Sequence, residues 1–409
     1  MLYSKHQENV DKAAHQEARR AGRVRSGNRK KEAILMTAKK NPPFRYDIVG
    51  SFLRPAALKK QRAAAARGEI SAAALRAAED AAIRDLVAKE KAAGLHAVTD
   101  GELRRRYWHL DFLAGLAGVE EVGAAHWSVA FKGAQPKAAT LEIRDRIDFP
   151  ANHPFLAHFR FLKEAAGGTL AKLTIPSHSM LHLICCVRAE HYAPIARYAD
   201  EQALYADIAA TYKKAVQAFY DAGCRYLQLD DTSWGEFCDA EKRAAYKARG
   251  FDLDEIARRY VAVINEIIAA KPADLTITMH ICRGNFRSTW FSSGGYEPVA
   301  ETLFGGCHVD GFFLEYDSER AGGFEPLRFI KNQQVVLGLV TSKSPELEKP
   351  SDIIARIEEA ARYVPLDRLC LSPQCGFSST EEGNLLTEED QWQKIALIKE
   401  IAESVWQDA

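Results

Sequence analysis

The sequence predicts an α/β protein, a single (β/α)8 barrel of the TIM type preceded by a basic N-terminal extension. Eight short apolar runs alternate with longer segments of helical periodicity, which is the element count of such a barrel. No Gly-x-Gly-x-x-Gly follows the first run, and no P-loop occurs anywhere in the chain. Both absences disfavour the main alternative, a doubly wound open sheet.

The first half of the chain supplies four of the predicted strands. Residues 71–93 are rich in alanine, with apolar residues at helical spacing, and Gly94 is suited to end that helix. After the second strand we expect a long irregular insertion that extends to about residue 150. The predicted strands of this half span 46–51, 95–101, 171–176 and 226–230, and a second helix spans 200–222.

The second half repeats the alternation more regularly. A helix over 252–270 precedes the fifth strand, and a short helix near 296–304 precedes the sixth. An amphipathic helix over 351–363 separates the last two strands, and 387–405 is the last predicted helix. The strands of this half span 275–281, 311–315, 334–341 and 368–372.

Composition narrows the class of protein. The 409 residues are 47% hydrophobic and contain 55 Lys and Arg against 55 Asp and Glu. This balance gives no overall basic field that would favour nucleic acid or a membrane surface as a partner. The sequence shows neither an apolar run of membrane-spanning length nor a secretory signal pattern. Its eight scattered cysteines favour a reducing compartment, and we expect a cytoplasmic protein.

Residues 1–40 differ from the rest of the chain. They are rich in Lys and Arg and poor in aromatic residues, so they offer little apolar surface for docking. We expect a flexible or loosely helical extension here, and one barrel domain over residues 41–409.

Polar or metal-binding side chains follow every predicted strand. In a barrel of this type the functional residues lie where strands end and the following loops begin. Packing alone does not explain such a residue at each of these positions. The residues are Ser51, Glu102, His178, Asp230, His280 with Cys282, Glu315, Lys343 and Cys375.

Four of these residues form a candidate zinc site. His280 and Cys282 lie two apart at the end of a strand, so both side chains can face one point. With Glu315 and Cys375 they supply one nitrogen, one oxygen and two sulfur donors, a set that suits tetrahedral zinc. An isolated His-x-Cys more often marks a buried thiol beside a structural histidine. The other two residues decide for the metal site.

The ligand set points to thiol activation. Four protein ligands leave no open position for a water molecule, which makes a simple zinc-hydroxide hydrolase less suitable. If Glu315 is displaced, an incoming thiol takes its place and is held as a thiolate near neutral pH.

At these positions the sequence resembles the cobalamin-independent methionine synthase family, and most closely its short, single-barrel members. The resemblance spans roughly residues 44–408. An isolated His-x-Cys is a weak signal, but the ordered set at successive strand ends is strong. The motifs are Val49-Gly-Ser-Phe52, Asp100-Gly-Glu102, Gln228-Leu-Asp230, His280-x-Cys282, Glu315 and Ser372-Pro-Gln-Cys-Gly376.

The resemblance implies a zinc-dependent methyltransferase that converts homocysteine to methionine. It places zinc on the homocysteine sulfur, Glu102 and Asp230 on the ammonium group, and Ser51 on the carboxylate. Both carboxylates also have possible structural roles: a salt bridge between Glu102 and one of Arg104–Arg106, and a helix cap or turn at Asp230.

Three departures concern the methyl donor. The chain is too short for the second barrel of the full-length family members. A family tryptophan beside the donor corresponds to His178, a tentative donor-binding residue, and a family histidine to Lys343, a tentative proton donor. The donor is therefore left open between a methylfolate, a corrinoid and another small molecule, as is a partner protein that delivers the methyl group.

Three other functions compete with this one. The sequence also resembles epoxyalkane:coenzyme M transferases, which use zinc to activate a different thiol. Glu102 and Asp230 favour homocysteine, because a sulfonate thiol would prefer Arg or Lys. A zinc hydrolase or lyase would need an open water position. A non-catalytic zinc-stabilised barrel would unfold once the metal is removed.

Overall fold

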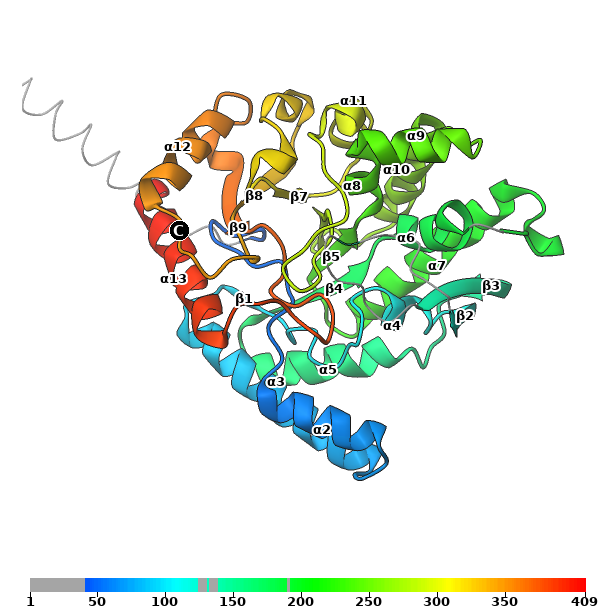
Figure 1. Cartoon of the computed structure of the whole chain (residues 1–409), viewed down its shortest axis with the longest axis horizontal. Coiled ribbons are helices and arrows are strands. Elements are labelled where there is room, and N and C mark those ends of the chain that lie inside the picture. The colour runs from blue at the N-terminus through cyan, green and yellow to red at the C-terminus, as the bar shows by residue number, and fades with distance from the viewer. Residues whose placement is uncertain (1–40, 124–130, 132–138, 190–191) are drawn as a thin grey trace, which may run out of the picture.

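A computed structural model describes residues 41–123, 131, 139–189 and 192–409 of the chain. The predicted N-terminal extension, residues 1–40, therefore lies outside the described residues. The model is an α/β protein with a curled parallel sheet that helices surround, consistent with a TIM-type barrel (Figure 1). None of its helices combines the length and apolarity that a bilayer crossing requires, among the residues described.

Seven parallel strands form the sheet, in the order β1-β4-β5-β6-β7-β8-β9. Most are fully buried, as expected when both faces of a parallel sheet are covered. Their carboxyl ends meet at one rim, which is where the candidate residues lie. The strands are β1 (Ala97–Val98), β4 (Leu170–Pro176), β5 (Tyr226–Asp231), β6 (Thr276–Ile281), β7 (Gly311–Glu315), β8 (Gln334–Val340) and β9 (Leu369–Pro373).

The first predicted strand, 46–51, is not a regular strand. Only Tyr46 pairs with the sheet, as an isolated parallel bridge to Leu371 of β9. On its other side, the Phe52 N–H donates to the Gly101 carbonyl at 3.0 Å. The segment thus lies between the two edge strands, β9 and β1.

Buried side chains replace the missing backbone ladder of this segment. The Lys172 ammonium donates to the Ile48 carbonyl, and Gln228 Nε2 donates to the Val49 carbonyl at 2.7 Å. Thr99 Oγ1 donates to the Gly50 carbonyl at 2.7 Å. These bonds satisfy carbonyls that a neighbouring strand would otherwise pair. Sequence periodicity predicted the extended conformation but could not reveal side-chain partners.

The prediction that the insertion up to about residue 150 is irregular is wrong. It contains the short helix α4 (Leu110–Leu113) and an antiparallel hairpin of β2 (Ala117–Gly123) and β3 (Ala139–Asp148). Leu141 and Ile147 of β3 are buried, while most of the residues between them are partly or fully exposed. Such a half-buried strand is rich in charge, which makes it look like a loop in sequence.

Most predicted helices are confirmed within a few residues. Their first turns show why they begin where they do: Asp252 accepts hydrogen bonds from two backbone N–H groups of α10, and Thr387 forms a capping box with Asp390. The corresponding helices are α3 (Ala72–Ala92), α7 (Glu201–Asp221), α10 (Leu253–Ala269), α11 (Glu297–Gly306), α12 (Pro350–Ala360) and α13 (Glu388–Val405).

Several further elements were not predicted. Most are too short for sequence periodicity to act on, but the helices over 56–66 and 154–166 have 11 and 13 residues and were missed despite their length. The unpredicted elements comprise α2 (Ala56–Ala66), α5 (Pro154–Ala166), α6 (His178–His182), the π-helix η1 (Leu183–Arg188), η2 (Ala196–Tyr198), α8 (Ser233–Cys238), α9 (Ala240–Ala248), η3 (Glu319–Ala321), η4 (Glu325–Phe329) and η5 (Leu366–Arg368).

Candidate metal centre and substrate cavity

The four predicted metal ligands lie together at the rim of the sheet. One ligand atom from each residue lies within 4.8 Å of the other three, and all four side chains are buried. His280 belongs to β6 and Cys282 follows it, Glu315 is the last residue of β7, and Cys375 follows β9. Parallel strands of one sheet therefore bring together residues that are up to 95 positions apart in sequence. We call these four residues the metal cluster.

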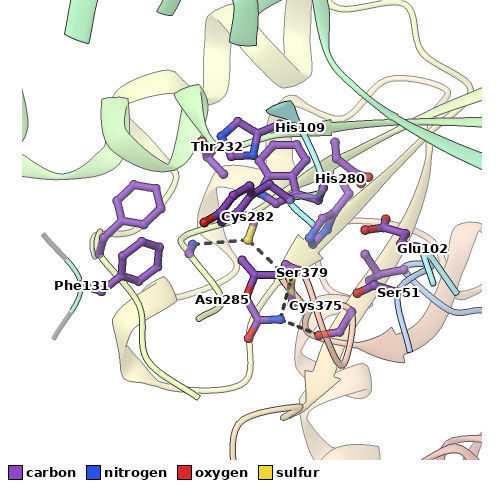
Figure 2. Close-up of a pocket in the computed structure, with 18 of the residues that line it drawn as sticks. Ser51, Glu102, His109, Phe131, Thr232, His280, Cys282, Asn285, Cys375 and Ser379 are labelled. Atoms are coloured by element: carbon purple, nitrogen blue, oxygen red, sulfur yellow. Dashed lines mark hydrogen bonds between the residues drawn. The ribbon is translucent and has the colours of Figure 1, made fainter. Parts of the chain in front are cut away.

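The atoms of the metal cluster fit a soft cation. Cys282 Sγ lies 3.5 Å from Cys375 Sγ (Figure 2). His280 places Nδ1 3.3 Å from the Phe313 carbonyl, whereas its buried Nε2 has no hydrogen-bond partner. A buried nitrogen without a partner is costly unless something binds it. A zinc ion would satisfy this nitrogen and neutralise both sulfurs.

The pKa shifts within the metal cluster also favour binding of a cation. The hydrogen bond from Cys282, followed by the nearby His280 ring, holds the pKa of Cys375 well below its usual range, against the effect of burial. The same sulfur pair raises the pKa of Cys282 well above its usual range. Burial lowers the pKa of His280, but the Cys375 thiolate, Asp230 and Glu315 outweigh burial and raise it. Without a further cation the site holds one thiolate, and a divalent cation would allow a second.

The three predicted substrate-binding residues line the same cavity as the metal cluster. Ser51, Glu102 and Asp230 all face this cavity, together with His280, Cys282 and Cys375. Figure 2 shows Ser51 and Glu102 on the side of the pocket where His280 lies. The space between these side chains amounts to about 710 Å³, part of which is open to solvent.

Glu102 combines a strained backbone with an incompletely satisfied carboxylate. Its φ angle is +58°, a conformation that non-glycine residues rarely adopt. Oε1 accepts from Thr174 Oγ1 at 2.9 Å and lies 3.3 Å from Arg105 Nη1, so the alternative of a salt bridge is realised in part. Oε2 is buried and has no partner. One oxygen therefore remains for a ligand.

Asp230 is poised for a cation as well. Its Oδ1 accepts from Gln228 Nε2 at 2.7 Å, and no helix cap is formed with it. Burial raises the pKa of Asp230 to about 7, with His280 lowering and Glu102 raising it. A bound ammonium group would favour the ionised form of both carboxylates.

Ser51 lies against the loop that carries Cys375. Its Oγ accepts from the Ser378 N–H at 3.2 Å. A Cβ atom on Gly376 would lie 2.0 Å from Ser51 Oγ, so only glycine allows this close approach. The glycine of Ser372-Pro-Gln-Cys-Gly376 thus packs the predicted carboxylate-binding residue beside a predicted metal ligand.

Lys343 and His178 do not line the cavity. Lys343 Nζ donates to the Gly284 carbonyl at 3.1 Å and to Asn285 Oδ1 at 3.2 Å, behind cavity residues. His178 is buried in the core, with Nε2 2.9 Å from the Tyr260 carbonyl and Nδ1 3.1 Å from Ser177 Oγ. Burial lowers the pKa of His178 to about 4. The position predicted to contact the methyl donor is therefore occupied by a neutral core histidine.

Sequence reasoning missed the opposite side of the cavity. The rings of Trp108 and His109 are tilted by 36° with centroids 4.5 Å apart, and the ring centroids of Phe131 and Phe291 are 5.2 Å apart in an edge-to-face arrangement. With Tyr107 these residues form what we call the aromatic wall. Burial and Arg188 lower the pKa of His109 to about 3. The wall comes from the segment after β1, from Phe131 between β2 and β3, and from the loop after β6, and the clustering of Tyr107-Trp108-His109 was its one visible signal.

The cavity also contains a buried arginine. Arg188 is the last residue of η1, and its Nε lies 3.0 Å from Glu236 Oε1. Its Nη2 donates to Thr232 Oγ1 at 3.1 Å. The charge of Arg188 is therefore compensated by a carboxylate behind the cavity.

Comparisons with known proteins agree with the geometry. The model of the family "Cobalamin-independent synthase, Catalytic domain" matches residues 177–389. Bacillus subtilis YxjH, described as uncharacterized, is 51% identical over 366 residues, covering 89% of this chain and 95% of that protein. A Thermococcus kodakarensis methionine synthase is 23% identical over 338 residues, covering 82% and 87%.

A solved structure extends the likeness to the fold. A Listeria monocytogenes protein, provisionally assigned as a vitamin-B12-independent methionine synthase, is 45% identical, with a TM-score of 0.72 over 91% of this chain and 99% of that chain. The His280, Cys282, Glu315 and Cys375 cluster matches the zinc site of the matching family. The chain therefore belongs to the cobalamin-independent methionine synthase catalytic-domain family.

Proposed function

We propose that the protein is a zinc-dependent S-methyltransferase that converts homocysteine to methionine. One observation carries the proposal: three members of the metal cluster, His280, Cys282 and Cys375, line the same cavity as two buried carboxylates, Glu102 and Asp230, and Glu315 completes the cluster beside it. The first group suits a thiolate-binding metal and the second suits an ammonium group. Homocysteine carries both a thiol and an ammonium group. The site would lie at the mouth of a closed (β/α)8 barrel, in which 46–51 takes the place of one strand.

The residues of the chain divide the work. His280, Cys282, Glu315 and Cys375 would hold zinc, which when bound lowers the pKa of a coordinated thiol. Glu102 and Asp230 bind the ammonium group and Ser51 the carboxylate, so that the sulfur points toward the cluster. The aromatic wall excludes water from the side on which a methyl donor would approach. Orientation in a dry cavity then favours direct transfer of the methyl group to sulfur.

The identity of the methyl donor and the source of the proton for its leaving group form a separate part of the proposal. The donor is a methylfolate, a corrinoid or another small methyl donor, used directly or delivered by a partner protein. Lys343 is proposed to supply a proton to the leaving group after it detaches from Gly284 and Asn285. Because the His178 ring nitrogens are hydrogen-bonded in the core, the aromatic wall is the better candidate for donor contact. All eight cysteines are free, which supports the proposal of a reducing, cytoplasmic location.

One observation favours a second candidate, alkyl transfer to a sulfonate thiol such as coenzyme M. Arg188 lines the cavity and could contact a sulfonate group. Its ion pair with Glu236 offsets that attraction, and the two carboxylates of the cavity repel an anion. Homocysteine therefore remains the first choice.

Calorimetric titration of zinc-loaded protein tests the proposal without knowledge of the donor. L-homocysteine and coenzyme M are titrated in buffers of different ionisation enthalpy, which counts released protons. The expected result is binding of homocysteine with release of about one thiol proton. Binding of coenzyme M alone would select the second candidate. Failure of both thiols to bind, with the zinc content intact, would refute thiol activation at this site.

A further inference from the structure

Arg320 contacts the metal cluster from behind. It belongs to η3, the 3-10 turn that follows β7. Its Nη2 lies 3.0 Å from Glu315 Oε2 and 3.1 Å from Asp317 Oδ1. The guanidinium carbon lies 4.7 Å from the ring centroid of Trp290. The exposed fractions of the Arg320, Glu315 and Asp317 side chains are 8%, 0% and 5%, so this network is shielded from water.

Glu315 differs in this respect from the other members of the metal cluster. Both of its oxygens have protein partners, because Oε1 also accepts from the Arg283 N–H at 2.9 Å. His280 Nε2, in contrast, has no partner. Glu315 is therefore the cluster residue whose charge the protein itself can hold when no metal is bound to it.

We infer that Arg320 is a positioning residue for ligand exchange, which holds the Glu315 carboxylate when a substrate thiolate takes its place at the metal. The inference rests on the proposed function. A carboxylate that leaves a cation inside a protein would become an uncompensated buried charge, which is strongly unfavourable. Arg320 removes this penalty, because Glu315 moves from one cation to another.

The exchange is balanced in charge and atoms. The thiol gives its proton to solvent, and its sulfur occupies the position that the carboxylate oxygen leaves. The carboxylate remains ionised against Arg320. Asp317 pairs with Arg320 before the exchange. While Glu315 is on the metal, the Arg320 charge is therefore still compensated by a buried carboxylate. Neither side of the exchange leaves Arg320 or Glu315 unpaired.

A double-mutant cycle separates this role from a merely structural one. Arg320→Met is combined with Asp317→Asn so that Asp317 is not left as an unpaired carboxylate and only the released Glu315 lacks its partner; Asp317→Asn alone is the matched control. We expect the combination to weaken L-homocysteine binding to the zinc-loaded protein by about tenfold or more, the worth of a charged hydrogen bond. In the Glu315→Gln background the same combination should change the affinity less than about twofold, because no carboxylate is then released. Equal losses in both backgrounds would overturn the inference.

Zinc affinity provides a second readout that needs no thiol. In competition with a chelator, the Arg320→Met, Asp317→Asn protein should bind zinc at least as tightly as wild type, because Glu315 has lost its competing partner. Arg320→Lys should restore most of the thiol affinity, since it keeps the charge. Weaker zinc binding by the neutral combination would contradict the inference. If wild-type protein binds no thiol, the proposed function fails and the zinc competition alone decides whether Arg320 competes for Glu315.

Discussion

Two sides of one cavity are built in different ways. The metal cluster comes from the carboxyl ends of β6, β7 and β9, three strands of one parallel sheet whose register fixes its geometry. The aromatic wall comes from the segment after β1, from Phe131 between β2 and β3, and from the loop after β6. Rigid elements hold side chains more exactly than loops do. The proposed thiol site is therefore fixed by the fold, whereas the proposed donor side can change with loop sequence.

The electrostatics of the two sides differ as well. On the cluster side the hydrogen bond from Cys282 lowers the pKa of Cys375 well below its usual range. Burial raises the pKa of Asp230 to about 7. On the wall, His109 is kept neutral, with a pKa of about 3. The cluster side carries ionisable groups that suit the proposed zinc ion and the zwitterion homocysteine, whereas the aromatic wall presents uncharged rings.

The largest expected effect is the loss of a metal ligand. Cys375→Ala should reduce zinc affinity by more than the roughly 10–100-fold that loss of an outer-shell partner causes, and homocysteine binding should vanish with it. Chelator competition measures the change. Cys224→Ala, which removes a buried thiol outside the cluster, is the control and should retain zinc. Equal zinc affinity in both variants would show that the cluster is not the metal site.

The next effect distinguishes the amino-acid end of the substrate. Glu102→Gln should weaken L-homocysteine binding by about tenfold to a hundredfold, because a charged hydrogen bond to the ammonium group is lost. Binding of 3-mercaptopropionate, which lacks that group, should be unchanged or improved. Calorimetry with both thiols gives the ratio. A parallel loss for both would mean that Glu102 acts on the fold and not on the ammonium group.

A smaller effect concerns stability and pH. The pKa of Asp230 is about 7 in the folded protein and about 3.9 in an unfolded chain. Its contribution to stability is therefore fully present below pH 4 and lost as the pH rises through 7. Asp230→Asn should raise the melting temperature of the metal-free protein by a few degrees at pH 8 and hardly at all at pH 4. A pH-independent difference would contradict an ionisation at this site.

The smallest expected effect lies on the aromatic wall. Trp108→Leu should change the homocysteine affinity less than about twofold, because Trp108 belongs neither to the metal cluster nor to the residues proposed to bind the ammonium and carboxylate groups. The same calorimetric titration measures it. A tenfold or greater loss of homocysteine affinity would mean that the aromatic wall contributes to thiol binding, and the contrast between the two sides would not hold.

The sequence predicted one side of the cavity better than the other for a physical reason. Residues at the ends of successive parallel strands converge by topology, so His280, Cys282, Glu315 and Cys375 could be grouped before any coordinates were known. Trp108 and Phe131 lie in an insertion whose path depends on tertiary packing, and no periodicity reveals which way they face. The segment 46–51 is intermediate: its extended form was predictable, but its side-chain hydrogen bonds from Lys172 and Gln228 were not.

The central claim is that a substrate thiol binds at the metal cluster in place of Glu315. X-ray absorption at the zinc edge, recorded before and after addition of L-homocysteine, tests it most directly. We expect the metal's first shell to change from two sulfurs, one nitrogen and one oxygen to three sulfurs and one nitrogen. A first shell that keeps its two sulfurs while homocysteine is bound would contradict the claim.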